Sequence, residues 1–163
     1  MKTILDVAKL VSEDGCFNLQ FRKDTRHERT NAPTYYRWKA QFVITGPKDT
    51  VKVFQKVKKE LGCGKVHLIK EQARLSVQNI NDIAELIIPY FKKKQLSGNK
   101  KKDFELWQKS VSILHKNKGI YMAKWKKNDL LSLMQIHEQM AKYKAKPKQH
   151  KWISMARTMV QAI

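Results

Sequence analysis

Two segments of this chain place apolar residues at every second position, and this pattern limits the fold more than any other feature of the sequence. The first is CFNLQFR at 16–22, where Phe17, Leu19 and Phe21 are apolar. The second is YYRWKAQFVIT at 35–45, with apolar positions at Tyr36, Trp38, Ala40, Phe42 and Ile44. A period of two residues is that of a β-strand with one buried face. We therefore predict two neighbouring strands, joined by the polar connector at 23–33.

The segments around these strands have the spacing of short helices. We expect one helix over 3–14, closed by Gly15, and a second that Asp49 caps and Gly62 closes. The second helix is expected to bury Val53, Phe54, Val57 and Leu61. GKVHLIKEQARLSVQN, at 64–79, then indicates a shorter pair of strands. The order helix, two strands, helix, two strands predicts an α+β fold with a four-stranded antiparallel sheet.

The rest of the chain is predicted to be helical. A helix from about Asn81 is expected to end or kink at Pro89, and Asp103 is expected to open the next helix. Another helix should run from Asn128 to about Tyr143. A last amphipathic helix has an apolar stripe of Trp152, Met155, Ala156, Met159, Val160 and Ile163.

The chain is expected to fall into two parts. Residues 1–120 form the main domain in this interpretation. Residues 121–163 form a basic C-terminal helical extension, packed on or beside it.

The charge of the chain favours a polyanionic partner. Against 34 Lys and Arg there are 14 Asp and Glu, for a formal net charge of +20. With 42% hydrophobic residues, the chain is too rich in core formers to be disordered. Nucleic acid is the first candidate, and a membrane surface is disfavoured because the basic residues lie on strands and linkers. Cys16 and Cys63 lack metal-ligand spacing, so we interpret both as reduced thiols.

The polar positions of the predicted strands carry amide and basic side chains, which can contact base edges in a major groove. An ordinary solvated sheet face is the alternative interpretation. The candidates are Asn18, Gln20, Arg22, Arg37, Lys39, Gln41, Lys65, His67, Arg74, Ser76 and Gln78. In the lysine run at 92–102, Lys93 and Lys100 are candidates for phosphate contact, with a solvated loop as the alternative.

Several segments together resemble one known family. VAKLVSEDG at 7–15 is similar to the nine-residue motif of the LAGLIDADG homing endonucleases. FVITGPKD, ELGCGKV and IIPYFKKKQLSGNKKKDFELWQKSV follow in the order expected for the single-motif branch, and the resemblance covers residues 5–114. It implies an αββαββα unit whose sheet lies in the major groove of DNA, plus C-terminal helices.

The resemblance also implies a chemistry. Asp14, at the eighth motif position, would bind Mg²⁺ or Mn²⁺, and Lys94 would lie near the scissile phosphate. Two motif helices would pack together in a homodimer that hydrolyses a phosphodiester bond on a roughly palindromic DNA site.

Three positions depart from the family pattern, and all of them belong to the cleaving part. Lys9 and Glu13 stand where small residues let the two motif helices touch, and Gly46 stands where a polar side chain is usual. We therefore favour a cleavage-impaired member, a monomer within a larger complex. It would bind structured RNA, such as ribosomal RNA in a ribonucleoprotein or mitoribosome-like particle, or an intron. The alternative is an active, metal-dependent homodimeric DNA endonuclease.

Two further expectations concern the location of the protein and its aromatic residues. Only six of the basic residues are Arg, a bias typical of AT-rich genomes, so we expect an organellar, organelle-encoded protein of a mitochondrion or chloroplast. Trp125 and Trp152 are flanked by basic residues, which suits either base stacking or core packing. The basic linker at 143–151 is expected to be held by nucleic acid.

Overall fold

A bent four-stranded antiparallel sheet forms the centre of the protein. The computed structural model describes residues 5–25, 34–143 and 153–161. The strand order is β1-β2-β4-β3, and the strands are β1 (Gly15–Thr25), β2 (Thr34–Pro47), β3 (Lys65–Ile69) and β4 (Gln72–Val77). Each neighbouring pair is antiparallel, so the predicted α+β fold and sheet are confirmed. β1 runs into the predicted connector as far as Thr25, and β2 is longer at both ends than the strand predicted at 35–45.

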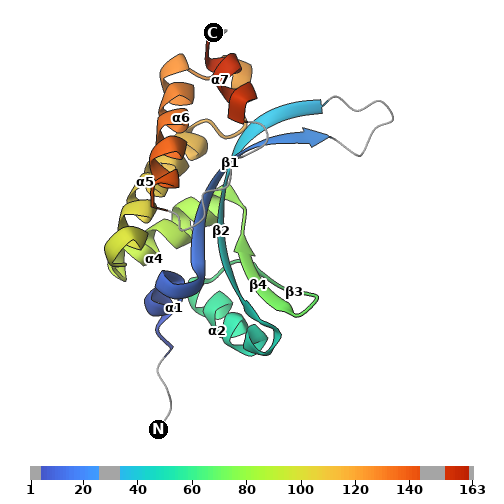
Figure 1. Ribbon diagram of the computed structural model, residues 1–163, viewed down its shortest axis with the longest axis vertical. Coiled ribbons are helices and arrows are strands. Elements are labelled where there is room, and N and C mark those ends of the chain that lie inside the picture. Colours follow the sequence, from blue (N-terminus) through green and yellow to red (C-terminus); the bar gives the residue numbers. More distant parts are fainter. Residues whose placement is uncertain (1–4, 26–33, 144–152, 162–163) are drawn as a thin grey trace.

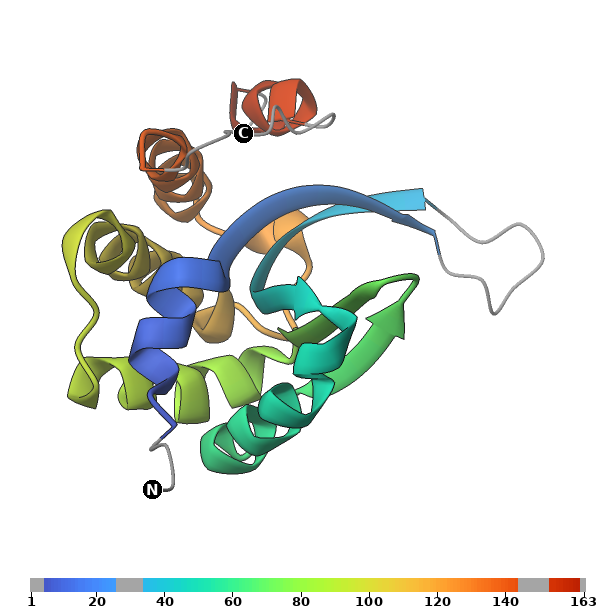
Figure 2. The same ribbon diagram turned by 60° about the horizontal axis from the view of Figure 1, so that its bottom comes forward.

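Helices cover one side of this sheet and leave the other side open (Figure 1). The covering helices are α2 (Val51–Leu61), α4 (Ile88–Lys93), α5 (Gly98–Lys116) and α6 (Lys127–Ala141). Two further helices, α1 (Val7–Asp14) and α7 (Ile153–Gln161), lie near the ends of the chain. Figure 2 shows the β1–β2 hairpin arching over the β3–β4 hairpin. The open side of the bent sheet is therefore a concave surface.

The alternation in the sequence places the core as predicted. Phe17, Leu19 and Phe21 of β1 are at most 2% exposed, and Phe42 of β2 is fully buried beside them. Phe17 lies at the centre of a cluster of rings that comes from four elements. Its ring centroid is 4.9 Å from that of Trp107 on α5 and 5.5 Å from that of Phe42. Burial of this apolar face holds the helices against the sheet.

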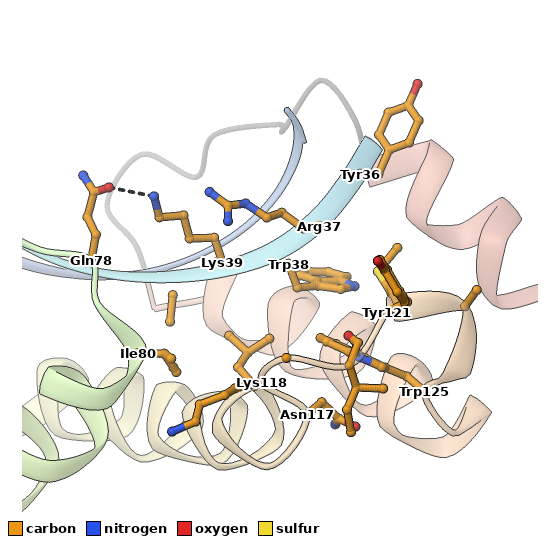
Figure 3. A pocket seen from close by; sticks show the side chains of 16 residues that line it. Tyr36, Arg37, Trp38, Lys39, Gln78, Ile80, Asn117, Lys118, Tyr121 and Trp125 are labelled. Carbon is orange, nitrogen blue, oxygen red and sulfur yellow. Dashed lines mark hydrogen bonds between the residues drawn. The ribbon is translucent and has the colours of Figure 1, made fainter. Parts of the chain in front are cut away.

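The second strand, β2, extends well beyond the segment that pairs with β4. β4 pairs with β2 between Phe42 and Pro47, whereas β1 pairs with β2 from Thr34 to Ile44. Within the described residues, the half of β2 before Phe42 therefore has β1 as its one strand neighbour. Its other edge faces the connection between α5 and α6, across the space shown in Figure 3.

The first helix is shorter than the sequence suggested. Asp6 caps α1 by accepting a hydrogen bond from the backbone N–H of Lys9 (3.1 Å), so the helix begins at Val7. It ends at Gly15, as predicted. A Cβ added at Gly15 would lie 2.7 Å from the backbone oxygen and the side chain of Val11, so only glycine fits this close approach.

The helix predicted from Asn81 was expected to end or kink at Pro89, and it does not end there. The helical path continues through Pro89 to Lys93, by way of a π-helical turn at Ile83–Ile87. The wider turn accommodates a residue that lacks a backbone N–H, so the proline neither ends the helix nor stops it before Phe91.

Three smaller expectations about the helices were wrong. α5 begins at Gly98 rather than at Asp103, because the lysines before Asp103 are good helix formers with room to face water. Asp49 makes no capping hydrogen bond to α2, and Thr50 instead donates its hydroxyl to the carbonyl of Pro47 (2.6 Å). Val53 is 38% exposed rather than buried, because α2 packs through Phe54 and Val57.

The C-terminal helices share the core of the sheet domain. Leu133 and Met140 of α6, and Ala156 and Val160 of α7, belong to the same buried hydrophobic cluster as the strands. The helix expected from Asn128 is thus confirmed as α6, and the last helix as α7. The basic linker and Trp152 lie outside the described residues.

Candidate nucleic-acid interface

The strand register brings the predicted contact residues onto the concave side of the sheet. Asn18 lies opposite Gln41, Gln20 opposite Lys39, and Arg22 opposite Arg37. The sheet has two arms, the β1–β2 hairpin and the β3–β4 hairpin. On the second arm, Lys65 lies opposite Ser76 and His67 opposite Arg74. We call this surface the outer face, and its residues are Asn18, Gln20, Arg22, Arg37, Lys39, Gln41, Lys65, His67, Arg74, Ser76 and Gln78.

These residues differ in how accessible they are. Arg22, Arg37, Lys65, His67 and Gln78 are exposed, and they lie toward the two arms of the sheet. Gln41 and Ser76 are each 6% exposed, because the centre of the concave sheet crowds them with neighbours. The arms, rather than the centre, therefore offer most of the side-chain surface.

Two side-chain hydrogen bonds organise the outer face. Lys39 Nζ donates to Gln78 Oε1 (2.6 Å), which links β2 to the end of β4 beyond their paired segment. Cys16 Sγ donates to Asn18 Oδ1 (2.9 Å) on the same side of β1. With Oδ1 engaged, the amide nitrogen of Asn18 is the part of that side chain that is left to donate.

The end of the first helix meets the beginning of α5. Asp14 is exposed at the last position of α1, and Lys100 Nζ donates to the carbonyl of the next residue, Gly15 (2.6 Å). Trp107, also on α5, donates its indole N–H to the carbonyl of Asn18 (2.9 Å). A lysine ammonium is thus fixed beside the motif acid. Lys94, which the family resemblance places near the scissile phosphate, is exposed at the end of α4 together with Lys93.

Lys100 was predicted as a phosphate contact and not as a neighbour of the motif. The contact between Lys100 and Gly15 could have been predicted only from the correct start of α5. A helix that begins at Gly98 turns Lys100 toward the sheet, whereas the sequence suggested a solvated loop before Asp103. The half-buried state of Lys100 agrees with this placement.

A single chain offers few ligands to a metal ion. Among the described residues, no group of three His, Cys, Asp or Glu side chains lies close enough together to hold one. Mg²⁺ is commonly bound by one or two carboxylates, with waters and substrate phosphates completing its shell. Asp14 is exposed at the end of α1, so its carboxylate is accessible for such a role.

The three residues that depart from the family pattern lie in two different environments. Lys9 and Glu13 are both exposed on α1, one turn apart. Gly46 lies near α2, where an added Cβ would be 3.0 Å from Thr50 Oγ1 and 3.2 Å from Phe54 Cζ. A larger residue at Gly46 would require these neighbours to shift.

Two titratable groups away from the outer face have raised pKa values. Burial, with a smaller contribution from Asp82, raises the pKa of the Cys63 thiol to about 11. Burial and the hydrogen bond that Tyr90 donates to Glu60 (2.7 Å) raise the pKa of the Tyr90 hydroxyl. In the part of the chain that the structure describes, neither cysteine forms a disulfide. None of the helices described is both long enough and apolar enough to span a bilayer.

A groove that the sequence did not indicate runs along the edge of β2 that lies opposite β1, before the segment that pairs with β4. Its volume is about 1030 Å³, and it is lined by β2 residues such as Trp38 and by the connection 117–125 between α5 and α6. Figure 3 shows Trp38, Tyr121 and Trp125 on one side of β2, with Arg37, Lys39 and Gln78 on the other. The groove therefore adjoins the outer face.

Comparison with solved structures defines the class of fold. The crystal structure of the homing endonuclease I-TnaI superposes with a TM-score of 0.73 at 19% identity, covering 94% of this chain and 95% of that one. The meganuclease I-SmaMI, bound to uncleavable DNA, superposes with a TM-score of 0.69 at 24% identity, covering 85% of this chain and 45% of that one. The fold is that of the homing endonucleases.

Sequence comparison then gives the family. The model of the LAGLIDADG endonuclease family matches residues 10–111, and this chain belongs to that family, as the motif predicted. "Probable intron-encoded endonuclease 3" of Neurospora crassa is 26% identical over 110 residues, covering 66% of this chain and 20% of the relative. "Probable intron-encoded DNA endonuclease 1" of Mycosarcoma maydis is 35% identical over 93 residues, covering 56% and 31%. The chain thus spans about a third or less of these relatives.

Proposed function

We propose that the outer face binds duplex DNA in its major groove. The observation that carries this proposal is the register of β1 and β2, which sets amide and basic side chains opposite each other along a bent two-stranded ribbon. A ribbon of this kind fits a major groove, and Arg, Asn and Gln side chains can distinguish base pairs there. The meganuclease of similar fold is bound to DNA, which supports the same ligand class.

In the endonuclease, the cleavage site would lie at the C-terminal end of α1. Asp14 would hold Mg²⁺ or Mn²⁺ together with a carboxylate from a second unit and the phosphates of the nucleic acid. The metal would supply an activated water and charge neutralisation at the leaving oxygen. Lys100, fixed by the Gly15 carbonyl, is the ammonium positioned next to this acid.

A homodimer is the assembly we propose for the DNA-binding form. One chain presents one motif, and I-SmaMI is about twice the length that this chain covers. Lys9 and Glu13 are exposed on α1, one turn apart, so two copies of the helix packed side by side with their Asp14 ends together can bring Lys9 of each within reach of Glu13 of the other. A Lys9→Glu variant is expected to weaken the dimer, and addition of Glu13→Lys to restore it, in sedimentation measurements. An unchanged dimer in the single variant would exclude this interface.

A second candidate function is binding of structured RNA without cleavage. The observations that favour it are the charged pair on α1, where close helix packing is usual, and the crowded Gly46, which leaves no polar side chain there. We also propose an organelle-encoded origin, which the intron-encoded relatives and the Lys-rich composition support.

One experiment separates the two candidates. A randomised DNA library is incubated with the protein and Mg²⁺ or Mn²⁺, beside an Asp14→Asn variant, and the ends are sequenced. Site-specific cuts that vanish in the variant support the endonuclease. Sequence-selective DNA binding without cuts leaves the outer face as a DNA reader alone. Absence of both, with RNA that co-purifies, supports the second candidate.

A further inference from the structure

Two side-chain amides of the outer face have their oxygen atoms bonded within the protein. Cys16 Sγ donates to Oδ1 of Asn18 (2.9 Å), and Lys39 Nζ donates to Oε1 of Gln78 (2.6 Å). Figure 3 shows the second bond, which joins β2 to the residue after β4. An amide side chain accepts through its oxygen and donates through its nitrogen. The nitrogens of both amides are therefore the atoms placed to meet a ligand.

The amide of Asn18 is turned along its own strand. Cys16 and Asn18 are two residues apart on β1, so their side chains are neighbours on the same face. Their bond directs Oδ1 toward Cys16, along the strand rather than away from the sheet. The backbone is anchored at the same residue, because Trp107 donates its indole N–H to the Asn18 carbonyl (2.9 Å). Asn18 is thus a donor held in one orientation.

Most of the accessible side chains around these amides are donors as well. Guanidinium and ammonium groups donate hydrogen bonds and accept none. The outer-face residues of this kind are Arg22, Arg37, Lys39, Lys65 and Arg74. Gln41 and Ser76 could accept hydrogen bonds, but each is only 6% exposed. The outer face is therefore suited to a base edge that accepts hydrogen bonds.

Guanine is the base whose major-groove edge fits this pattern. Its N7 and O6 atoms are two adjacent acceptors, whereas adenine offers one acceptor and one donor, and thymine offers one acceptor beside a methyl group. The usual pairing of Asn or Gln with adenine uses the amide oxygen as well as the nitrogen. Adenine would therefore require Asn18 or Gln78 to break the bond that its oxygen makes within the protein.

We propose that the outer face selects guanine at the base pairs that Asn18 and Gln78 contact. Cys16 and Lys39 are the positioning residues, because they hold the two amides as donors. This inference rests on the proposed binding of duplex DNA by the outer face, and it adds the kind of base that the face selects.

The test is selection of binding sites from a randomised duplex DNA library by the full chain, without added divalent metal. The position that Asn18 contacts is the one whose preference is lost in Asn18→Ala. Replacing guanine by adenine there should weaken binding roughly 5- to 150-fold, the discrimination of one good bidentate contact. Replacing it by 7-deazaguanine, which pairs normally but lacks the N7 acceptor, should also weaken binding.

Variants of the positioning residues test how the preference arises. Cys16→Ala releases the Asn18 oxygen, so adenine should be accepted at that position, whereas Cys16→Ser keeps a donor and should keep guanine. Lys39→Met should relax the preference at the position of Gln78, and Lys39→Arg should retain it. Ser112→Ala is the matched control, because Ser112 is exposed on α5 and its hydroxyl donates within that helix, to the Gln108 carbonyl (3.2 Å). The control should leave the selected sequence unchanged.

An infrared measurement tests the thiol bond without DNA. The S–H stretching band of Cys16, assigned by its loss in Cys16→Ala, should shift in Asn18→Ala, and an unshifted band would overturn the positioning role. Duplex binding without a guanine preference, or with the same preference in Cys16→Ala, would overturn this proposal alone. Absence of any selected duplex would refute the proposed function, and the base preference with it.

Discussion

Phe17 offers the most direct test of how the sheet and helices are held together. Its side chain is fully buried, and its ring centroid lies 4.9–5.8 Å from those of Phe42, Phe91, Phe104 and Trp107. Phe→Ala changes in cores cost about 3–5 kcal/mol. The surrounding rings come from β2, α4 and α5, so they cannot all collapse into the cavity. We therefore expect Phe17→Ala to cost about 4–5 kcal/mol, near the upper end.

The assay is urea unfolding followed by tryptophan fluorescence and by circular dichroism. With a slope of about 2 kcal/mol per molar urea, the midpoint should fall by about 2 M. Phe17→Leu keeps most of the volume and should cost under about 2 kcal/mol. Leu68→Ala is the control, because Leu68 is 52% exposed on β3 and its loss should change stability by no more than about 0.5 kcal/mol. A cost below about 2 kcal/mol for Phe17→Ala, with an unchanged slope, would refute the argument.

Three further predictions follow from single contacts. Gly15→Ala should lower the free energy of unfolding by about 1–3 kcal/mol, because the new Cβ would meet Val11, and thermal unfolding measures this. Since the pKa of Cys63 is raised to about 11 in the folded state, its contribution to stability should be lost as pH rises from about 9 to 11, and Cys63→Ala should remove that loss. The hydrogen bond from Lys116 lowers the pKa of Asp129, so Asp129→Asn should reduce the loss of stability on acidification below about pH 4. No change in the pH profile of either variant would contradict the assigned cause.

Period-two alternation was sufficient to predict the sheet and its two faces. Phe17, Trp38 and Phe42 are buried where the pattern placed them, and the polar positions between them share the outer face. The pattern could not give the burial of Gln41, because that depends on how strongly the sheet bends and crowds its centre.

Features that depend on distant parts of the chain were missed. Lys100 reaches Gly15 because α5 begins earlier than Asp103, and the length of a helix start rich in lysine is weakly encoded. The groove exists because β4 stops pairing with β2 at Phe42, a tertiary fact that no local pattern carries.

The alternation of β1 also bears on how this chain can change over generations. Each odd position from Phe17 to Phe21 is buried in the core, whereas each even position from Asn18 to Arg22 lies on the outer face. Substitutions at the even positions can therefore accumulate with little loss of stability, which lets recognition drift toward a new target while the scaffold persists. An inserted residue has the opposite effect, since it exchanges the two sets at once. Lineages of such a protein should diverge by replacement within these strands and by insertion outside them.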